Sequence, residues 1–330
     1  MPLKEVRDPN LWDAFVEELG GGPYLYWAWR EAVEKAYGHK ALYLAAFEGN
    51  TPSGLLPLVV FKTPLKRYLI SLPFCDYGGI LARDEKSFAL LFEEAFKLAG
   101  RKKLEIRFPE SPEFMEPFPP AGKVRLILEL PESKEILWKQ LKSKVRSQVR
   151  RPRKEGAEAL VGGLEFLPAF YKIYRETMHY LGSPAHDFKW FKILLLAFKE
   201  RARVVLVHLK ETPLAGAILL FSRDTATVPW AASLRAYKRI SPNMLLYWTM
   251  LALAADKGLK YFDFGRSSPG SGTYRFKKQW GVYEKPLYWF GRTVSEKPSR
   301  KRELLAKGWQ KMPAPLAHWL GPQLRRFISL

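Results

Sequence analysis

One pattern of secondary structure occurs twice along the 330-residue chain, and this duplication is the strongest constraint on its fold. The sequence predicts one hairpin over 41–62 and another over 204–221, with turns that read TPSGLLPL and TPLAGAIL. A strand follows each hairpin, then a helix that ends at a glycine (LFEEAFKLAG and LYWTMLALAADKG), then another strand (KLEIRF and KYFDFG). Because four elements share one order at an offset of about 160 residues, we predict two copies of one α/β unit.

The duplication also predicts where the chain divides. We expect a first domain at 1–135, a linking basic helix with the second domain at 136–291, and a basic amphipathic tail at 292–330. The linking helix over 138–154 has eight basic residues and no acid from Lys139 onward, and Pro152 is expected to end or kink it. The tail is expected either to lie on a membrane surface or to pack on the domain.

The charge of the chain indicates an anionic partner. It has 54 basic and 33 acidic residues, a net charge of +21. Nucleic acid, a phosphate-bearing substrate and a membrane surface all fit such a charge. The N-terminus shows no signal-peptide pattern, and the longest apolar run is too short to span a bilayer. We therefore expect a cytoplasmic protein, peripheral at the inner face of the membrane if it meets the membrane at all, and the His and Cys spacing predicts no metal site.

The stretch YFDFGRSSPGSGTYRFKKQWGVYEKPLY, residues 261–288, is the candidate active-site wall. It reads as a short buried strand, a glycine-rich polar turn, a short helix and another strand. Asp263 lies inside the apolar strand, and Lys277 lies on the helix between Phe276 and Trp280. The counterpart in the first half, KLEIRFPESPEF, lacks the Gly/Ser turn and the lysine-bearing helix. We therefore expect the site in the second copy.

The segment FDFGRSSPGSGTYRFKKQWG resembles the FemAB-like proteins, specifically the subgroup associated with exopolysaccharide and PEP-CTERM/exosortase systems. The stretches SLPFCDYGGIL, KSKVRSQVRRPRKEG, ETMHYLGSPAHDFKWF and SPNMLLYWTMLALAADKG extend the resemblance over about residues 27–281. It implies an α/β (α+β) fold of two tandem GNAT-like acyltransferase domains, with mixed, mostly antiparallel sheets flanked by helices. It also implies transfer of an activated acyl or aminoacyl group to an amine of a cell-envelope or polysaccharide precursor, the chemistry of peptidoglycan-bridge formation.

The donor stays open at this point. The stretch LRAYKRISPN, where a CoA-binding GNAT domain has its glycine-rich phosphate loop, contains no glycine. No sustained heptads predict the coiled-coil arm common in tRNA-using Fem enzymes. Aminoacyl-tRNA and acyl-CoA are both retained as donor substrates, and no bound cofactor is expected. An acyl-CoA-dependent N-acetyltransferase is the first alternative, and a non-catalytic RNA- or membrane-surface-binding protein is the second.

The resemblance and the residue chemistry together give candidate site residues. Lys277 is expected to hold a tRNA phosphate or to stabilise the developing oxyanion, with a solvated helix lysine as the alternative. Asp263 is expected to act as a base, or to pair with Arg266 or cap the following turn. Arg146 and Arg150 match the helix that meets the phosphates of the acceptor. The other predicted substrate-binding residues are Asp76, Tyr77, His186, Tyr237, Asn243, Arg266, Ser267 and Tyr274.

Overall fold

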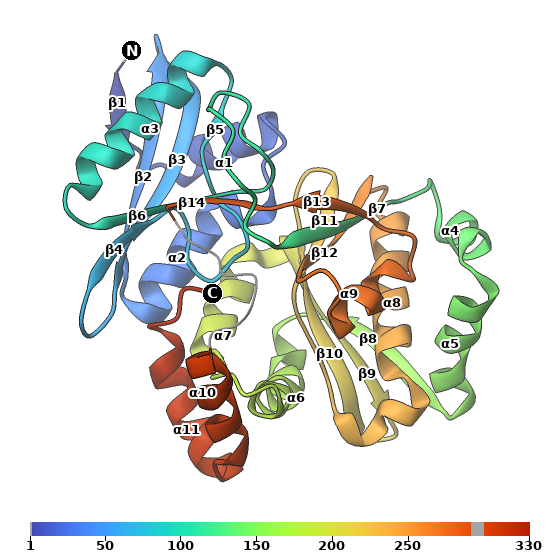
Figure 1. The fold of residues 1–330 in the computed structure, drawn as a ribbon. Coiled ribbons are helices and arrows are strands. Elements are labelled where there is room, and N and C mark those ends of the chain that lie inside the picture. The colour runs from blue at the N-terminus through green and yellow to red at the C-terminus, as the bar shows by residue number, and fades with distance from the viewer. Residues whose placement is uncertain (1, 292–299) are drawn as a thin grey trace.

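A computed structural model describes residues 2–291 and 300–330 of the chain, which form two mixed sheets flanked by helices (Figure 1). The first unit contains β1 (Leu3–Glu5), α1 (Pro9–Glu18), α2 (Trp27–Tyr37), β2 (Lys40–Glu48), β3 (Thr51–Lys62), β4 (Arg67–Ile70), β5 (Leu81–Ala82), α3 (Glu85–Ala99) and β6 (Lys103–Phe108). The second contains β8 (Ala157–Gly162), α6 (Leu167–Tyr180), α7 (Phe188–Phe198), β9 (Ala202–Leu209), β10 (Thr212–Phe221), β11 (Thr225–Ser233), α8 (Pro242–Asp256) and β12 (Tyr261–Ser267). Apart from β5, the order of elements is the same in both.

The remaining elements join and follow these units. The segments between the units are β7 (Val124–Glu129), α4 (Lys134–Gln140) and α5 (Ser143–Lys154). Those after the second unit are α9 (Gly272–Lys278), β13 (Tyr283–Pro286), β14 (Tyr288–Phe290), α10 (Arg300–Lys311) and α11 (Ala314–Arg325). The first eight residues of the predicted tail lie outside the described part of the chain. Among the described residues, no helix is both long and apolar enough to cross a membrane.

Each sheet has seven strands. The first has the order β1-β2-β3-β4-β6-β14, with β5 paired to β3, and the second has the order β13-β7-β12-β11-β10-β9-β8. The pairs β4–β6 and β11–β12 are parallel, and the other pairs are antiparallel. The prediction of mixed, mostly antiparallel sheets flanked by helices is confirmed.

The two halves exchange strands. β7 follows β6 in the chain but pairs with β12 of the second sheet, whereas β14 follows β12 but pairs with β6 of the first. In Figure 1, β13 and β14 run across the junction between the halves. The domain boundary at residue 135 stays a prediction, since β7 lies before that residue and yet belongs to the second sheet.

Two predicted elements differ from the structure. The strand expected after the first hairpin, which the residue pattern extends over 68–82 around SLPFCDYGGIL, is reduced to β4 and β5, because Pro73 and the pair Gly78–Gly79 favour the loop that separates them. The linking helix is broken into α4 and α5 at 141–142, and α5 continues two residues beyond Pro152. Proline has a helical φ and removes only one backbone donor, so it is tolerated near the end of α5.

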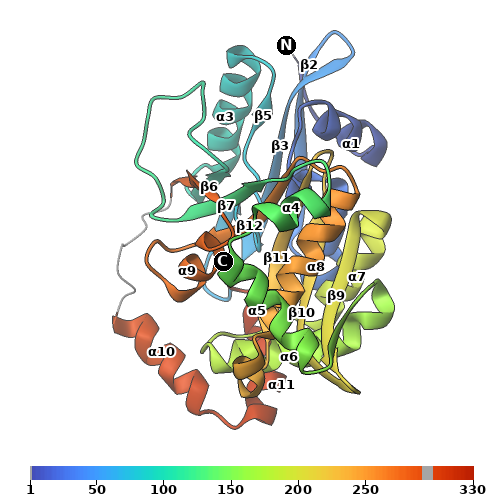
Figure 2. The same ribbon diagram turned by 90° about the vertical axis from the view of Figure 1, so that its right-hand side faces the viewer.

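Packing places the two units against each other. One core contains buried side chains of α2, α6 and α7, including Trp29, Phe170 and Trp190, and so spans both halves. A second core lies on the opposite face of the second sheet, where α4 and α5 cover α8 (Figure 2). The two halves also meet between the two sheets, where β7, β12 and the loop after β4 lie together.

Candidate active site at the junction of the two sheets

The parallel strand pairs occupy matching positions in the two sheets. Tyr68–Ile70 lies in register with Lys103–Glu105, and Thr225–Thr227 lies in register with Tyr261–Asp263. Beyond those three residues, β11 continues along β10 while β12 continues along β7, so the two strands separate. Glu105 and Asp263 thus hold the same position, the last paired residue before the separation. The carboxyl ends of separating parallel strands are a frequent place for ligand sites in α/β folds.

Asp263 is 1% exposed and forms a buried ion pair with Arg125 of β7. Its Oδ2 accepts hydrogen bonds from Nε and Nη2 of Arg125 at 2.9 and 2.8 Å. Its Oδ1 accepts one from the backbone N–H of Gly265 at 2.8 Å, so the predicted cap of the following turn is present. The predicted pairing with Arg266 is wrong, because Arg125 on the exchanged strand reaches the carboxylate instead.

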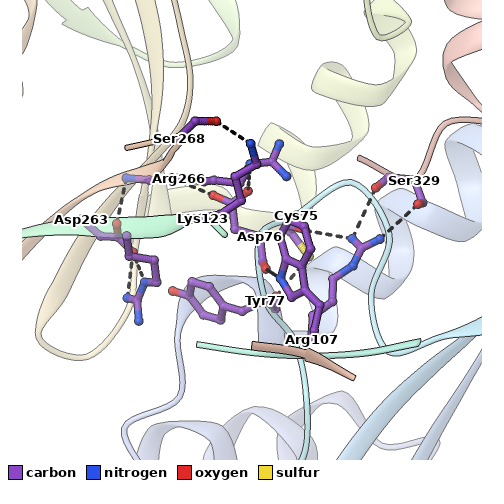
Figure 3. Close-up of polar contacts among 12 residues, drawn as sticks. Cys75, Asp76, Tyr77, Arg107, Lys123, Asp263, Arg266, Ser268 and Ser329 are labelled. Carbon is purple, nitrogen blue, oxygen red and sulfur yellow. Dashed lines mark hydrogen bonds and ion pairs between the residues drawn. The ribbon is translucent and has the colours of Figure 1, made fainter. Parts of the chain in front are cut away.

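Arg266 pairs with Asp76, which comes from the loop after β4 in the first half (Figure 3). Asp76 Oδ2 accepts a hydrogen bond from the backbone N–H of Arg266 at 3.0 Å, and Oδ1 lies 3.2 Å from its Nε. The carbonyl oxygen of Asp76 accepts a further bond from Trp289 Nε1 at 3.0 Å. Asp76 and Arg266, both predicted site residues, therefore clamp the two halves together.

Lys277 is buried on the inner side of α9, with 8% of its surface exposed. Its Nζ donates to the carbonyl oxygens of Gly265 and Arg266 at 3.1 and 3.0 Å. Burial lowers the pKa of Lys277 to about 8, against the opposing influence of Asp76 and Asp263. A solvated helix lysine is excluded. We call Asp76, Arg125, Asp263, Arg266 and Lys277 the central cluster.

Gly265 gives β12 the shape that brings these groups together. Its φ is +73°, a conformation that other residues rarely adopt, and the pairing of β12 with β7 shifts register between Asp263 and Arg266. A Cβ at this position would lie 3.1 Å from the carbonyl oxygen of Val228. The bulge turns the Gly265 and Arg266 carbonyls toward Lys277 and turns the Arg266 N–H toward Asp76.

Three further predicted residues lie near the end of β12. Ser267 is buried, and within the described part of the chain its hydroxyl has no hydrogen-bond partner, which is unusual for a buried polar group. Tyr77 lies against the central cluster, with the Arg125 guanidinium 4.4 Å from its ring centre. Tyr274 on α9 donates to Glu284 at 2.6 Å. The structure therefore brings Tyr77 and Ser267 beside the central cluster and gives Tyr274 a separate partner.

Two predicted residues lie beside the start of α8. Tyr237 is half-buried in the 3-10 turn η4 (Arg235–Ile240), and Asn243 is half-buried in the first turn of α8. Ser241 stands at the N-cap position of α8, where serine side chains often accept a hydrogen bond from the helix, but its φ is +59° and it makes no capping hydrogen bond. The left-handed backbone turns its side chain away from the first helical N–H groups. These residues follow Ser233, the last residue of β11, beyond the point where β11 separates from β12.

His186 does not face the central cluster. It is fully buried, and its Nδ1 lies 2.8 Å from the Tyr37 hydroxyl. Its Nε2 accepts a hydrogen bond from Nε of Arg325 at 3.1 Å, so a neutral ring carries its proton on Nδ1. Burial, and secondarily Arg325, keep the pKa of His186 well below its usual value. These contacts tie the first half to the C-terminal segment.

Arg146 and Arg150 also lie apart from the central cluster, on α5. Nη1 of Arg146 donates to the carbonyl oxygens of Leu141, Lys139 and Trp138 at 2.8, 3.1 and 3.4 Å, so it caps the C-terminal end of α4. The exposed Arg150 stacks over Trp138, 5.2 Å from the ring centre. A groove of about 670 Å³ opens beside α4, α5 and α8 and contains no member of the central cluster among its lining residues.

The corresponding place in the first sheet is filled. Arg107, two residues after Glu105, is fully buried and donates to Glu105 Oε1, Leu72 O and Cys75 O at 2.7–2.9 Å. It also bonds to Ser329, whose carbonyl oxygen accepts from Phe74 N at 2.7 Å. The second sheet has Gly265 at the equivalent position. This difference supports the expectation that the second copy contains the site.

Sequence reasoning missed Arg125, Lys123 and Trp289. Lys123 donates to the Ser268 hydroxyl (Figure 3). Trp289 Nε1 donates to the backbone carbonyl oxygen of Asp76. One signal was available for Arg125, because it is a charged residue inside the apolar strand VRLILE. Among the described residues, no three His, Cys, Asp or Glu side chains are placed to hold a metal ion.

Comparison with known proteins agrees with this fold. Residues 143–278 match the family model of an acetyltransferase (GNAT) domain. A stretch of 77 residues is 31% identical to lipid II:glycine glycyltransferase of Staphylococcus haemolyticus and covers 21% of this chain and 18% of that protein. The crystal structure of FemX superposes on 93% of this chain and 100% of its own with a TM-score of 0.69 at 18% identity. L-PGS from Bacillus licheniformis covers 94% and 100% with a TM-score of 0.56 at 15% identity.

Proposed function

The chain resembles the FemAB-like transferases in sequence and in its pair of GNAT-like units, and we propose that it is an acyl- or aminoacyltransferase. The proposed acceptor is an amine on a cell-envelope or polysaccharide precursor that carries phosphate. The glycyltransferase similarity supports this class of acceptor, although the matched stretch covers less than a fifth of that relative. The exopolysaccharide association expected from the sequence is part of the proposal.

One observation carries the assignment of the site. A buried lysine with a pKa of about 8 lies where β11 and β12 separate and donates to the carbonyl oxygen of Arg266. The next residue, Ser267, has a buried hydroxyl without a hydrogen-bond partner among the described residues. Acyl transfer to an amine builds negative charge on the carbonyl oxygen, and a fixed cation in a site shielded from water stabilises that charge. We therefore assign Lys277 as the cation that meets the donor carbonyl or its neighbouring phosphate. Ser267 is the proposed hydrogen-bond donor beside it.

Asp263 is proposed as a positioning residue. Two of its hydrogen bonds go to Arg125 and one to Gly265 N, so its carboxylate is committed to holding the strand. The geometry supports that role over the base expected as one alternative from the sequence. Asp76 and Arg266 set the position of the Arg266 carbonyl, which in turn accepts from Lys277.

The donor is tested by direct comparison. The purified chain is incubated with an aminoacyl-tRNA or with an acyl-CoA and an amine-bearing envelope precursor, and product is measured by mass spectrometry. We expect turnover with aminoacyl-tRNA, because η4 precedes α8 and Pro242, which has no N–H, begins it, where a CoA-binding domain needs free N–H groups for the pyrophosphate. Turnover with acyl-CoA alone, together with CoA binding in calorimetry, would instead support the N-acetyltransferase.

The pH dependence of kcat/KM tests the charge state of Lys277. With a pKa of about 8, Lys277 is mostly protonated at neutral pH and loses its charge as the pH rises. We expect kcat/KM to fall about tenfold per pH unit above this pKa. Lys277→Arg keeps the charge and is expected to move the falling limb to higher pH. An unchanged falling limb in Lys277→Arg would show that another group causes it.

A second candidate function rests on α5. Its exposed basic residues can bind phosphate groups, and the neighbouring Trp138 can stack on a base. A non-catalytic RNA-binding protein would show affinity that falls steeply with salt and no turnover with either donor. A tRNA donor and peripheral contact with a membrane through the C-terminal tail are likewise proposals.

A further inference from the structure

The C-terminal hairpin, formed by α10 and α11, exposes large apolar side chains. Leu304 and Leu305 on α10 are 62% and 65% exposed, and Leu316 and Trp319 on α11 are 43% and 63% exposed. Residues three positions apart on a helix share a face, so Leu316 and Trp319 lie on the same side of α11. Four such side chains on two joined helices form more apolar surface than scattered exposed leucines.

The hairpin is nevertheless fixed to the body of the protein by its other side. Ala317 and Gly321 are buried, and a Cβ on Gly321 would lie 3.2 Å from Ala185 N, so glycine allows a close approach. His179 Nε2 lies 3.0 Å from the Met312 carbonyl oxygen, and Gln310 donates to the carbonyl of Tyr180 at 2.8 Å. Packing on the domain and an exposed apolar face therefore coexist.

The end of α6 extends the same surface. Tyr180 and Leu181 are 49% and 57% exposed and lie at the α6 end that α10 contacts. Gly182 approaches α10 so closely that a Cβ would lie 2.7 Å from the Ala306 carbonyl oxygen. In Figure 1, α6, α10 and α11 lie together at the lower edge of the molecule. We call Tyr180, Leu181, Leu304, Leu305, Leu316 and Trp319 the apolar face.

Exposed positive charge lies on the same hairpin as the apolar face and next to Tyr180. Residues 300–330 contain seven basic residues and a single acidic one, Glu303. Arg300, Lys307 and Lys311 are exposed. Arg235 stacks on Tyr180, 4.7 Å from its ring centre, and donates to its hydroxyl at 2.7 Å. Arg235 is the first residue of η4, two residues after the end of β11. The charged surface therefore continues toward the place where β11 and β12 separate.

We propose that the apolar face docks on a bilayer of anionic phospholipid. Leucine and tryptophan side chains would enter the boundary between headgroups and acyl chains, and the neighbouring cations would meet lipid phosphates. A second copy of the chain fits poorly, because a two-fold contact through this face would place the same cations against each other. The proposal rests on the proposed function for its purpose, which is to hold the separated ends of β11 and β12 beside an acceptor at the membrane.

Vesicle flotation with the purified chain tests the apolar part. The vesicles are phosphatidylcholine alone or with about one third phosphatidylglycerol. We expect binding to the anionic vesicles and at least about a tenfold loss in the double variant Leu305→Glu/Trp319→Glu, because both side chains would carry charge into the apolar boundary. Leu65→Glu is the matched control, since Leu65 is 92% exposed outside the apolar face, and its binding should stay within about twofold of wild type.

Single substitutions test the charged part. Lys307→Ala and Lys311→Ala should each weaken anionic-vesicle binding about fivefold, and Lys102→Ala, exposed in the turn before β6, should not. The proposal would be overturned if the wild-type chain did not bind anionic vesicles. It would also be overturned if Leu305→Glu/Trp319→Glu bound them as well as wild type, or if wild type bound both vesicle types equally. A dimer in light scattering that the double variant dissociates would overturn it as well. Turnover of a water-soluble acceptor should survive the double variant, which separates this proposal from the proposed function.

Discussion

Lys277→Ala is expected to lower kcat about 100- to 1,000-fold, the usual loss when one fixed donor to a developing oxyanion is removed. The reason is geometric. Lys277 is the buried cation that α9 holds against β12, and its two bonds to the Gly265 and Arg266 carbonyls fix the direction of its remaining N–H. A methyl group restores neither charge nor donor. The measurement is single-turnover transfer with saturating donor, which separates chemistry from binding.

Lys278→Ala provides the control for that variant. Lys278 is the next residue on α9, is exposed, and pairs with Glu284 at 2.9 Å. Its loss removes a cation from the same helix without touching the central cluster, so kcat should stay within about twofold of wild type. Equal losses in both variants would point to general charge rather than to Lys277. Full activity in Lys277→Ala would remove Lys277 from the mechanism.

A loss of activity in variants of Lys277 must also be distinguished from a loss of folded protein. The pKa of Lys277 is about 8 in the folded chain and near its ordinary value of 10.5 in the unfolded one. The unfolded state therefore binds more protons between these values, and the free energy of unfolding rises with pH across that window. Below pH 8 the buried charge costs up to about 3 kcal/mol, so Lys277→Met should be at least as stable as wild type at pH 7. Denaturant unfolding checks this directly.

Local patterns predicted most of the fold, because each one is written in a few consecutive residues. The strand expected after the second hairpin is found as β11, and the expected order of helix, glycine and strand is present in both units, ending in β6 and β12. The exchange of β7 and β14 could not be read in this way. Val124–Glu129 has the composition of a strand, but its partner β12 lies more than a hundred residues further along the chain. Strand partners depend on packing that no local pattern records.

The same limit applies to the candidate site. Pairing of Asp263 with Arg266, three residues away, was one of the alternatives expected, yet its partner is Arg125, and Arg266 pairs with Asp76. Residues close in sequence account for turn and cap contacts, such as the hydrogen bond from the Gly265 N–H to Asp263. They do not indicate ion pairs between strands that the two halves exchange. Arg146 illustrates the reverse case. The resemblance to the Fem helix implied a phosphate-binding face, but the chain breaks between α4 and α5, and the Arg146 guanidinium caps the end of α4 there.

The ion pair between Asp263 and Arg125 is expected to contribute most to stability among the polar contacts of the central cluster. Arg125→Met should lower the free energy of unfolding by about 3–5 kcal/mol, because it leaves the Asp263 carboxylate charged and without its partner in a buried place. Lys285→Met removes an exposed ion pair at a similar distance, 2.9 Å, and should cost at most about 1 kcal/mol. Denaturant titrations followed by tryptophan fluorescence give both values.

A second substitution shows whether the cost comes from the stranded charge. Adding Asp263→Leu to Arg125→Met removes the unpaired carboxylate, and apolar replacement of both partners of a buried pair is often neutral. The double variant should therefore recover most of the lost stability while the Gly265 N–H loses its acceptor. Recovery of stability without recovery of turnover would assign the pair to holding β7 and the β12 bulge in the geometry that Lys277 needs. A double variant as unstable as Arg125→Met would show instead that the arginine acts through its packing on Tyr77.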